Sequence, residues 1–111
     1  MRDTRSDEET TPDSIATALK TAFRRESAGR SNIKFEVHLG GFVVSAHVRN
    51  GEVDVTTAPI EKPDLIIEAG AGIRQLMAQE LTPQQALENK VVRMVSGDVK
   101  MLGRFAEIFR S

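Results

Sequence analysis

Three consecutive segments with an alternating apolar pattern constrain the fold of this chain more than any other feature. Segments 33–39 and 42–48 place apolar residues at every second position, and segment 52–56 continues the pattern. Alternation with a period of two predicts half-buried strands. Gly40-Gly41 separates the first two segments, and Asn50-Gly51, which favours a type I′ hairpin turn, separates the last two. The sequence therefore predicts an antiparallel three-stranded meander.

Two-residue turns also predict the register of this meander, because the residues that flank each turn must pair. They place Arg49 opposite Glu52. They also place His47 between Lys34 on one side and Asp54 on the other. The polar side chains between the apolar positions then form a ladder of charges on the outer face of the sheet.

Cap residues mark the starts of three predicted helices. Thr11-Pro12 and Thr82-Pro83 each combine an N-cap residue with proline at the first helical position, and Asp98 is a third cap. The apolar stripe after the first cap predicts a helix over 13–27. Asn89, which tolerates the left-handed conformation, is predicted to end the second helix.

The second half of the chain adds two strands and the remaining helical segments. Segment 57–63 contains two prolines and no periodicity, which predicts a loop that crosses to the far side of the sheet. Strands are predicted at 64–68 and 91–96, with a helical apolar patch at 73–77 and a turn at Gly70-Ala71-Gly72. The predicted fold is an α+β sandwich, a five-stranded mainly antiparallel sheet with helices packed on one face.

Composition limits the class of protein. A length of 111 residues with 40% hydrophobic content fits one small domain, and we expect it to span 11–111 after a charged tail at 1–10. A net charge of −1 argues against nucleic-acid binding by this chain alone. The chain has no cysteine and no apolar run after its first charges, so we expect a cytoplasmic protein.

Candidate catalytic groups are few. Four titratable side chains should share the outer face of the sheet, but a flat face open to water neither excludes solvent nor shifts pKa values as catalysis requires. No nucleophile elbow or phosphate-binding motif is present. We therefore expect a protein that is not an enzyme and uses no metal or cofactor. The four side chains are those of Glu36, His38, His47 and Asp54.

Apolar stripes at helical spacing outnumber these groups in the second half of the chain, which favours holding an oily ligand over transforming one. Core packing is the commoner role of such stripes. Three of the four methionines, Met77, Met94 and Met101, lie in this half, and methionine suits walls that adapt to ligands of varied shape.

Several short motifs of this half resemble the sterol carrier protein type-two family. They are Pro-Asp-Leu-Ile-Ile-Glu at 63–68, Leu76-Met77, Leu-Thr-Pro-Gln-Gln-Ala at 81–86 and Ser-Gly-Asp at 96–98. The resemblance covers about 33–109. Two departures are Asn89, where the family commonly has glycine, and a C-terminus without the peroxisomal signal of the animal carriers.

The resemblance implies a hydrophobic tunnel between sheet and helices that takes sterols, fatty acyl chains or other lipids. Its expected partners are a lipid or another apolar small molecule, with transient membrane contact and a homodimer as further options. Carried over by position, the lining consists of Leu76, Met77, Leu81, Ala86, Leu87, Met94, Met101, Leu102, Phe105 and Phe109.

Three roles fit this expectation. A free-standing, non-catalytic lipid carrier that transfers its cargo ranks first. A ligand-sensing or accessory module acting with another protein, such as a transcription regulator or an enzyme, ranks second. A structural dimerisation domain with a filled core ranks third.

Overall fold

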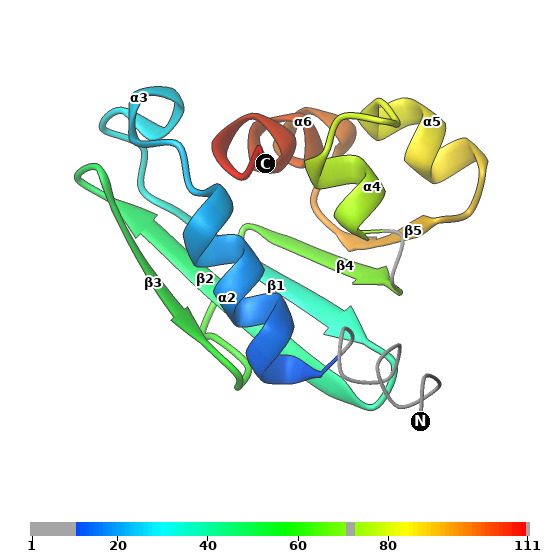
Figure 1. Ribbon diagram of the computed structural model, residues 1–111, viewed down its shortest axis with the longest axis horizontal. Helices are drawn as coiled ribbons and strands as arrows, with labels where there is room; N and C mark the ends of the chain where they lie inside the picture. Colours follow the sequence, from blue (N-terminus) through cyan, green and yellow to red (C-terminus); the bar gives the residue numbers. More distant parts are fainter. Residues whose placement is uncertain (1–10, 71–72, 111) are drawn as a thin grey trace.

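The computed structural model describes residues 11–70 and 73–110, and it contains a five-stranded sheet in the order β3-β2-β1-β4-β5 (Figure 1). The pairing of β1 with β4 is parallel, and the other pairings are antiparallel. The predicted tail at 1–10 and the turn residues Ala71 and Gly72 lie outside the described residues. The strands are β1 (Ile33–Leu39), β2 (Phe42–Arg49), β3 (Glu52–Thr56), β4 (Leu65–Ala69) and β5 (Val92–Ser96).

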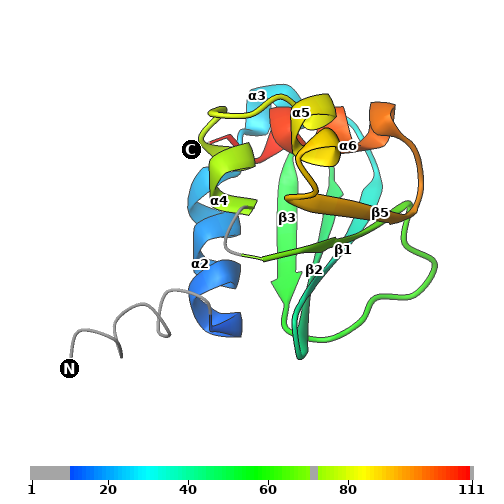
Figure 2. The ribbon, with the colours of Figure 1, turned by 90° about the vertical axis from the view of Figure 1, so that its right-hand side faces the viewer.

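The helices gather on one side of this sheet, as Figure 2 shows, which confirms the predicted α+β sandwich. The apolar positions of β1, Phe35, Val37 and Leu39, are buried on that side. None of the helices in the described part of the chain is long and apolar enough to cross a membrane. The helices are α2 (Pro12–Ala22), α3 (Arg25–Ala28), α4 (Ile73–Met77), α5 (Pro83–Glu88) and α6 (Val99–Ile108).

The register of the meander agrees with the prediction. Arg49 pairs with Glu52, and His47 pairs with Lys34 on β1 and with Asp54 on β3. The Asn-Gly turn explains this precision, because both of its residues have the positive φ that a type I′ turn requires.

The predicted caps are also confirmed. The Thr11 side chain accepts a backbone N–H in the first turn of α2. Thr82 and Gln85 form a reciprocal capping box, with bonds of 3.1 and 3.0 Å. Asp98 Oδ1 accepts the backbone N–H of Met101 at 2.9 Å and begins α6.

The predicted helix over 13–27 is wrong in its middle, where Phe23 is extended and separates α2 from α3. Phe23 forms an isolated antiparallel bridge with Phe109. The backbone N–H of Arg24 donates to the carbonyl of Ile108 at 2.6 Å. Bonds to the end of the chain thus replace helical bonds, and they place the Phe23 ring 6.0 Å from that of Phe109.

The stop of α5 differs from the prediction by one residue. Asn89 is the C-cap with φ −83°, and Lys90 takes the left-handed conformation with φ 60°. The N–H of Val91 donates to Ala86 and that of Lys90 to Leu87, which is the bonding pattern of a Schellman motif. This motif requires the left-handed residue after the cap, so Lys90 takes the position that glycine commonly fills.

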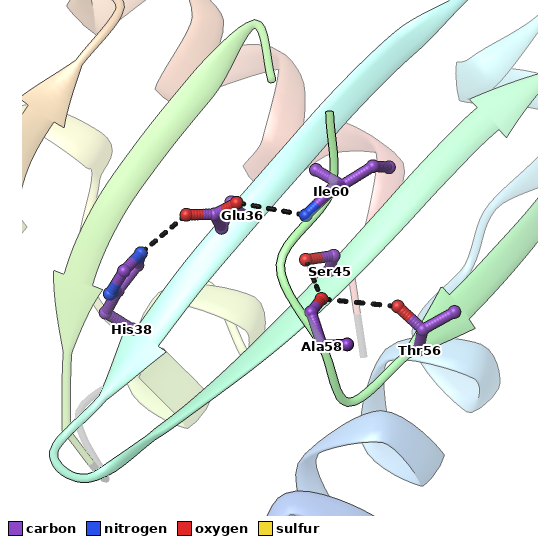
Figure 3. Close-up of polar contacts among 6 residues, drawn as sticks. All are labelled: Glu36, His38, Ser45, Thr56, Ala58 and Ile60. Carbon is purple, nitrogen blue, oxygen red and sulfur yellow. Dashed lines mark hydrogen bonds and ion pairs between the residues drawn. The ribbon is translucent and has the colours of Figure 1, made fainter. Parts of the chain in front are cut away.

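The outer face of the sheet is covered where the loop 57–64, here called the strap, crosses β2 and β1 on its way from β3 to β4 (Figure 3). Ser45 Oγ donates to the Ala58 carbonyl at 2.6 Å. The N–H of Ile60 donates to Glu36 Oε1 at 3.1 Å. Glu36 and Ser45 are only 7% and 1% exposed, so the prediction of a flat face open to water is wrong here.

Replacing Gly97 by alanine should destabilise the fold by about 1–3 kcal/mol. Gly97 has φ 106°, and a Cβ there would lie 3.0 Å from both the Asp64 carbonyl oxygen and Leu65 Cδ1. Urea unfolding measures the effect. Gly103→Ala in α6 is the matched control, because its Cβ meets nothing within 4 Å and a helical Gly→Ala change stabilises by up to about 1 kcal/mol. Equal stability of the two variants would contradict this account.

Candidate ligand-binding site

An aromatic block fills the space between the sheet and α6. Phe35 on β1 meets Phe105 and Phe109 edge-on, with ring centroids 5.3 and 5.9 Å apart. Phe105 and Phe109 lie 5.1 Å from each other, and all three rings are fully buried. Such contacts add roughly 0.5–1.5 kcal/mol per pair to the burial of the rings. The block therefore occupies the layer in which the sequence predicts a tunnel.

The residues predicted to line the tunnel all belong to this apolar layer or pack against it, but their contact with a ligand stays a prediction. Six are buried in the core: Leu76, Met77, Ala86, Leu102, Phe105 and Phe109. Four are partly buried against it: Leu81, Leu87, Met94 and Met101.

A groove of about 480 Å³ separates α2 from α4, here called the α2/α4 groove. Its apolar wall includes Ala18 and Ala22 of α2 and Met77 of α4. Arg74 Nη2 reaches across it and donates to Ser14 Oγ at 3.5 Å. The remaining lining residues are Thr17, Thr21 and Arg24.

A second groove of about 410 Å³, the α5/β5 groove, lies between α5 and the edge strand. Its apolar lining consists of Leu87, Val92 and Met94, with Lys90 and Arg93 beside them. Two of the predicted residues, Leu87 and Met94, therefore face this groove.

The two grooves flank α4 and α5, which together are here called the lid (73–88). Leu76 on α4 and Ala86 on α5 are fully buried beneath it. Sequence reasoning missed the contribution of α2, because Ala18 and Ala22 follow the same helical spacing as the core residues of that helix. Small side chains at such positions were the available signal, since they leave room beside a helix.

The outer face carries the titratable groups. His38 Nε2 lies 2.6 Å from Glu36 Oε2, and His47 Nε2 lies 2.9 Å from Asn32 Oδ1. The hydrogen bond from Arg93 holds the pKa of Glu68 below its ordinary value and raises the pKa of Arg93. Within 11–70 and 73–110, no three His, Asp or Glu side chains are placed to hold a metal ion.

Comparison with known proteins identifies the fold. No protein-family model matches the chain, and no curated protein does. Among solved structures, the sterol carrier protein domain 2 of Helicoverpa armigera matches 89% of this chain and 91% of its own length, at 16% identity and a TM-score of 0.66. Palmitated sterol carrier protein 2 like 2 of Aedes aegypti matches 87% of this chain and 92% of its own length, at 18% identity and a TM-score of 0.57. The chain has the sterol-carrier fold.

A larger protein contains the same fold. The sec-alkylsulfatase Pisa1 from Pseudomonas sp. matches 91% of this chain at 21% identity and a TM-score of 0.78. This chain spans only 16% of the length of that enzyme. The sterol-carrier fold thus occurs both as a small protein and as one part of a long chain.

Replacing Phe105 by alanine should cost about 3–5 kcal/mol, because it removes the ring in the centre of the aromatic block of this sterol-carrier fold. Urea unfolding followed by circular dichroism measures the loss. Val95→Ala is the control, since Val95 is 50% exposed and should change stability by no more than about 0.5 kcal/mol. A loss below 1 kcal/mol for Phe105→Ala would mean that the block is loosely packed.

Proposed function

We propose that this protein binds a hydrophobic ligand, such as a fatty acyl chain or a sterol, beneath the lid and acts as a non-catalytic lipid carrier. The observation that carries the proposal is the pair of grooves on either side of two short helices that cover an apolar core. A ligand that passes under the lid would enter at the α2/α4 groove and reach the α5/β5 groove. The path would contact Met77, Leu76 and Leu87, all of them predicted lining residues.

The energetics favour a site that opens only for its ligand. A lipid that buries on the order of 300 Å² of apolar surface gains roughly 7 kcal/mol before ordering costs. A permanent dry cavity of about 300 Å³ would cost a similar amount, which is comparable to the whole stability of a small domain. The closed lid avoids this cost, because Leu76 and Ala86 pack into the core until a ligand displaces them.

The lid is less firmly attached to the rest of the fold than α6 is, so the lid is the element proposed to move. Arg24 Nε donates to the Arg110 carbonyl at 2.7 Å. Arg104 Nη2 donates to the Ser27 carbonyl at 3.2 Å and to Ser31 Oγ at 2.7 Å. These bonds fasten α6 to the segment around α3. By contrast, α4 and α5 have five and six residues, and helices this short are marginal without tertiary packing.

The solved structures support the ligand class. The protein of Aedes aegypti is described as palmitated, and its fold matches most of this chain. A saturated acyl chain is narrow and flexible, so it can follow a path between helices that a rigid ligand would need to force open. Palmitic acid is therefore the first probe, with cholesterol as the rigid comparison.

Blocking the α2/α4 groove should abolish palmitate binding. Ala18→Trp places a large ring in the groove, and we expect at least a tenfold loss of affinity because the acyl chain can no longer enter. Lys20→Trp on the exposed side of the same helix is the control and should bind normally. Native mass spectrometry and the ligand-induced rise in Tm report the binding.

Met94→Trp tests the other groove in the same way. Loss of binding in both groove variants supports a path beneath the lid, whereas loss in one alone confines the ligand to that groove. Absence of any bound mass and of any change in Tm with palmitic acid or cholesterol would contradict the proposal.

A second candidate is an accessory domain for an enzyme. The match to part of the alkylsulfatase favours it, because there the fold is joined to a much longer chain. Co-expression with an enzyme encoded beside this protein, followed by light scattering, tests it. A stable complex of fixed stoichiometry would support the accessory role, and a lipid-binding monomer would favour the carrier.

A further inference from the structure

A polar pocket of about 460 Å³ lies on the outer face of the sheet, where β1 and β4 end and β5 begins. It is here called the outer-face pocket. The lid lies on the opposite side of the sheet (Figure 2). Lys90 and Arg93 line both this pocket and the α5/β5 groove, so the two sites meet at the edge strand. Its lining residues are His38, Gly40, Glu68, Ala69, Gly70, Lys90, Val91 and Arg93.

A row of charged groups crosses three strands beside this pocket. His38 on β1 pairs with Glu68 on β4, and Glu68 pairs with Arg93 on β5. Arg93 Nε donates to Glu68 Oε1 at 2.8 Å. This contact leaves the terminal guanidinium nitrogens of Arg93 available, and Lys90 adds a further positive charge to the lining. The pocket therefore offers more cationic than anionic groups.

A contact with the buried Glu36 carboxylate fixes the position of the His38 imidazole. Glu36 is buried, and the N–H of Ile60 in the strap binds its Oε1. Its Oε2 lies 2.6 Å from His38 Nε2, and the ring extends away from Glu36 (Figure 3). This contact occupies Nε2, whichever of the two groups carries the shared hydrogen. It fixes the position of the ring beside the pocket.

Lys90 provides an independent observation. A lysine at φ 60° is backbone strain that glycine would avoid and asparagine would tolerate better. The Schellman motif that ends α5 accounts for this conformation, and lysine in place of glycine at this position puts a charge beside the pocket. Lys90 lines the outer-face pocket and has no ion pair with any described residue. Its charge is therefore available to a ligand.

We propose that the outer-face pocket binds a compact oxyanion, a carboxylate or a phosphate group. Arg93 supplies the terminal N–H groups that match two anionic oxygens. Lys90 supplies a point charge, and the His38 ring, whose position is fixed by Glu36, forms one wall of the pocket. A free small molecule and the headgroup of a lipid both present these oxygens, and the experiments below distinguish the two sources.

Inorganic phosphate tests the site directly. In ¹⁵N–¹H spectra of the full chain at constant ionic strength, phosphate should produce saturable shifts at Gly40, Gly70 and Val91. Lys90→Gly, which relieves the backbone strain while removing the charge, should weaken binding at least about tenfold and retain the fold. Lys100→Gln, which removes an exposed charge outside the pocket, should bind phosphate as the natural chain does.

Dodecyl phosphate and dodecanol then distinguish the two sources of the anion. A lipid headgroup site predicts that dodecyl phosphate binds much more tightly than inorganic phosphate and that Lys90→Gly weakens dodecyl phosphate by a larger factor than it weakens dodecanol. A site for a free anion predicts similar affinities for the two phosphates.

The proposal is overturned if neither phosphate shifts the pocket amides, or if Lys90→Gly and Lys100→Gln behave alike. Palmitate binding is tested through the α2/α4 groove, which shares no lining residue with the outer-face pocket. The oxyanion site can therefore fail while the carrier function stands, and the reverse also holds.

Discussion

The parallel pairing of β1 with β4 is the constraint on which the rest of the structure depends. Because β3 lies at one edge of the sheet, the chain must cross β2 and β1 before β4 can begin. That crossing creates the strap, and the strap buries Glu36 and Ser45 on a face that would otherwise be wet. The same pairing places β4 and β5 beside the meander, with the lid above them. Both proposed sites thus depend on this one crossover connection between β3 and β4.

The aromatic block limits the empty space that so small a domain can enclose. A chain of 111 residues has little apolar material beyond what its own core requires. Phe35, Phe105 and Phe109 keep the layer between sheet and α6 dense. Under the proposed carrier function, ligand carbon competes with the lid's own apolar contacts, so affinity would depend on the stability of α4 and α5 as much as on the shape of the ligand.

Local features were predictable from the sequence, because each is determined by a few adjacent residues. Asn50-Gly51 determined the hairpin and its register, and Thr82 and Asp98 determined where α5 and α6 begin. The strap was predicted as a crossing loop, but its burial of Glu36 was not. Which strands pair in parallel depends on contacts between distant segments. The alternating pattern of one strand does not indicate which other segment covers that strand.

The break at Phe23 belongs to the same class, because its cause lies at the other end of the chain. The helical spacing of Ile15, Leu19 and Phe23 is genuine, yet the bridge to Phe109 prevails over it. For the candidate site, the predicted apolar residues lie in the helices or their flanking turns, except Met94 on β5, while the wall formed by α2 was missed. Alanine gives a weak signal there, because a small side chain leaves space beside the helix without producing a distinctive sequence pattern.

The bridge between Phe23 and Phe109 also bears on how the protein is made. The carbonyl of Ile108 that receives the N–H of Arg24 is synthesised long after Arg24 itself. A contact between such distant positions carries a loop-closure cost that local contacts do not. The bond between Arg24 and Ile108 therefore cannot form until translation has passed residue 108, whereas the β1-β2-β3 meander can already pair.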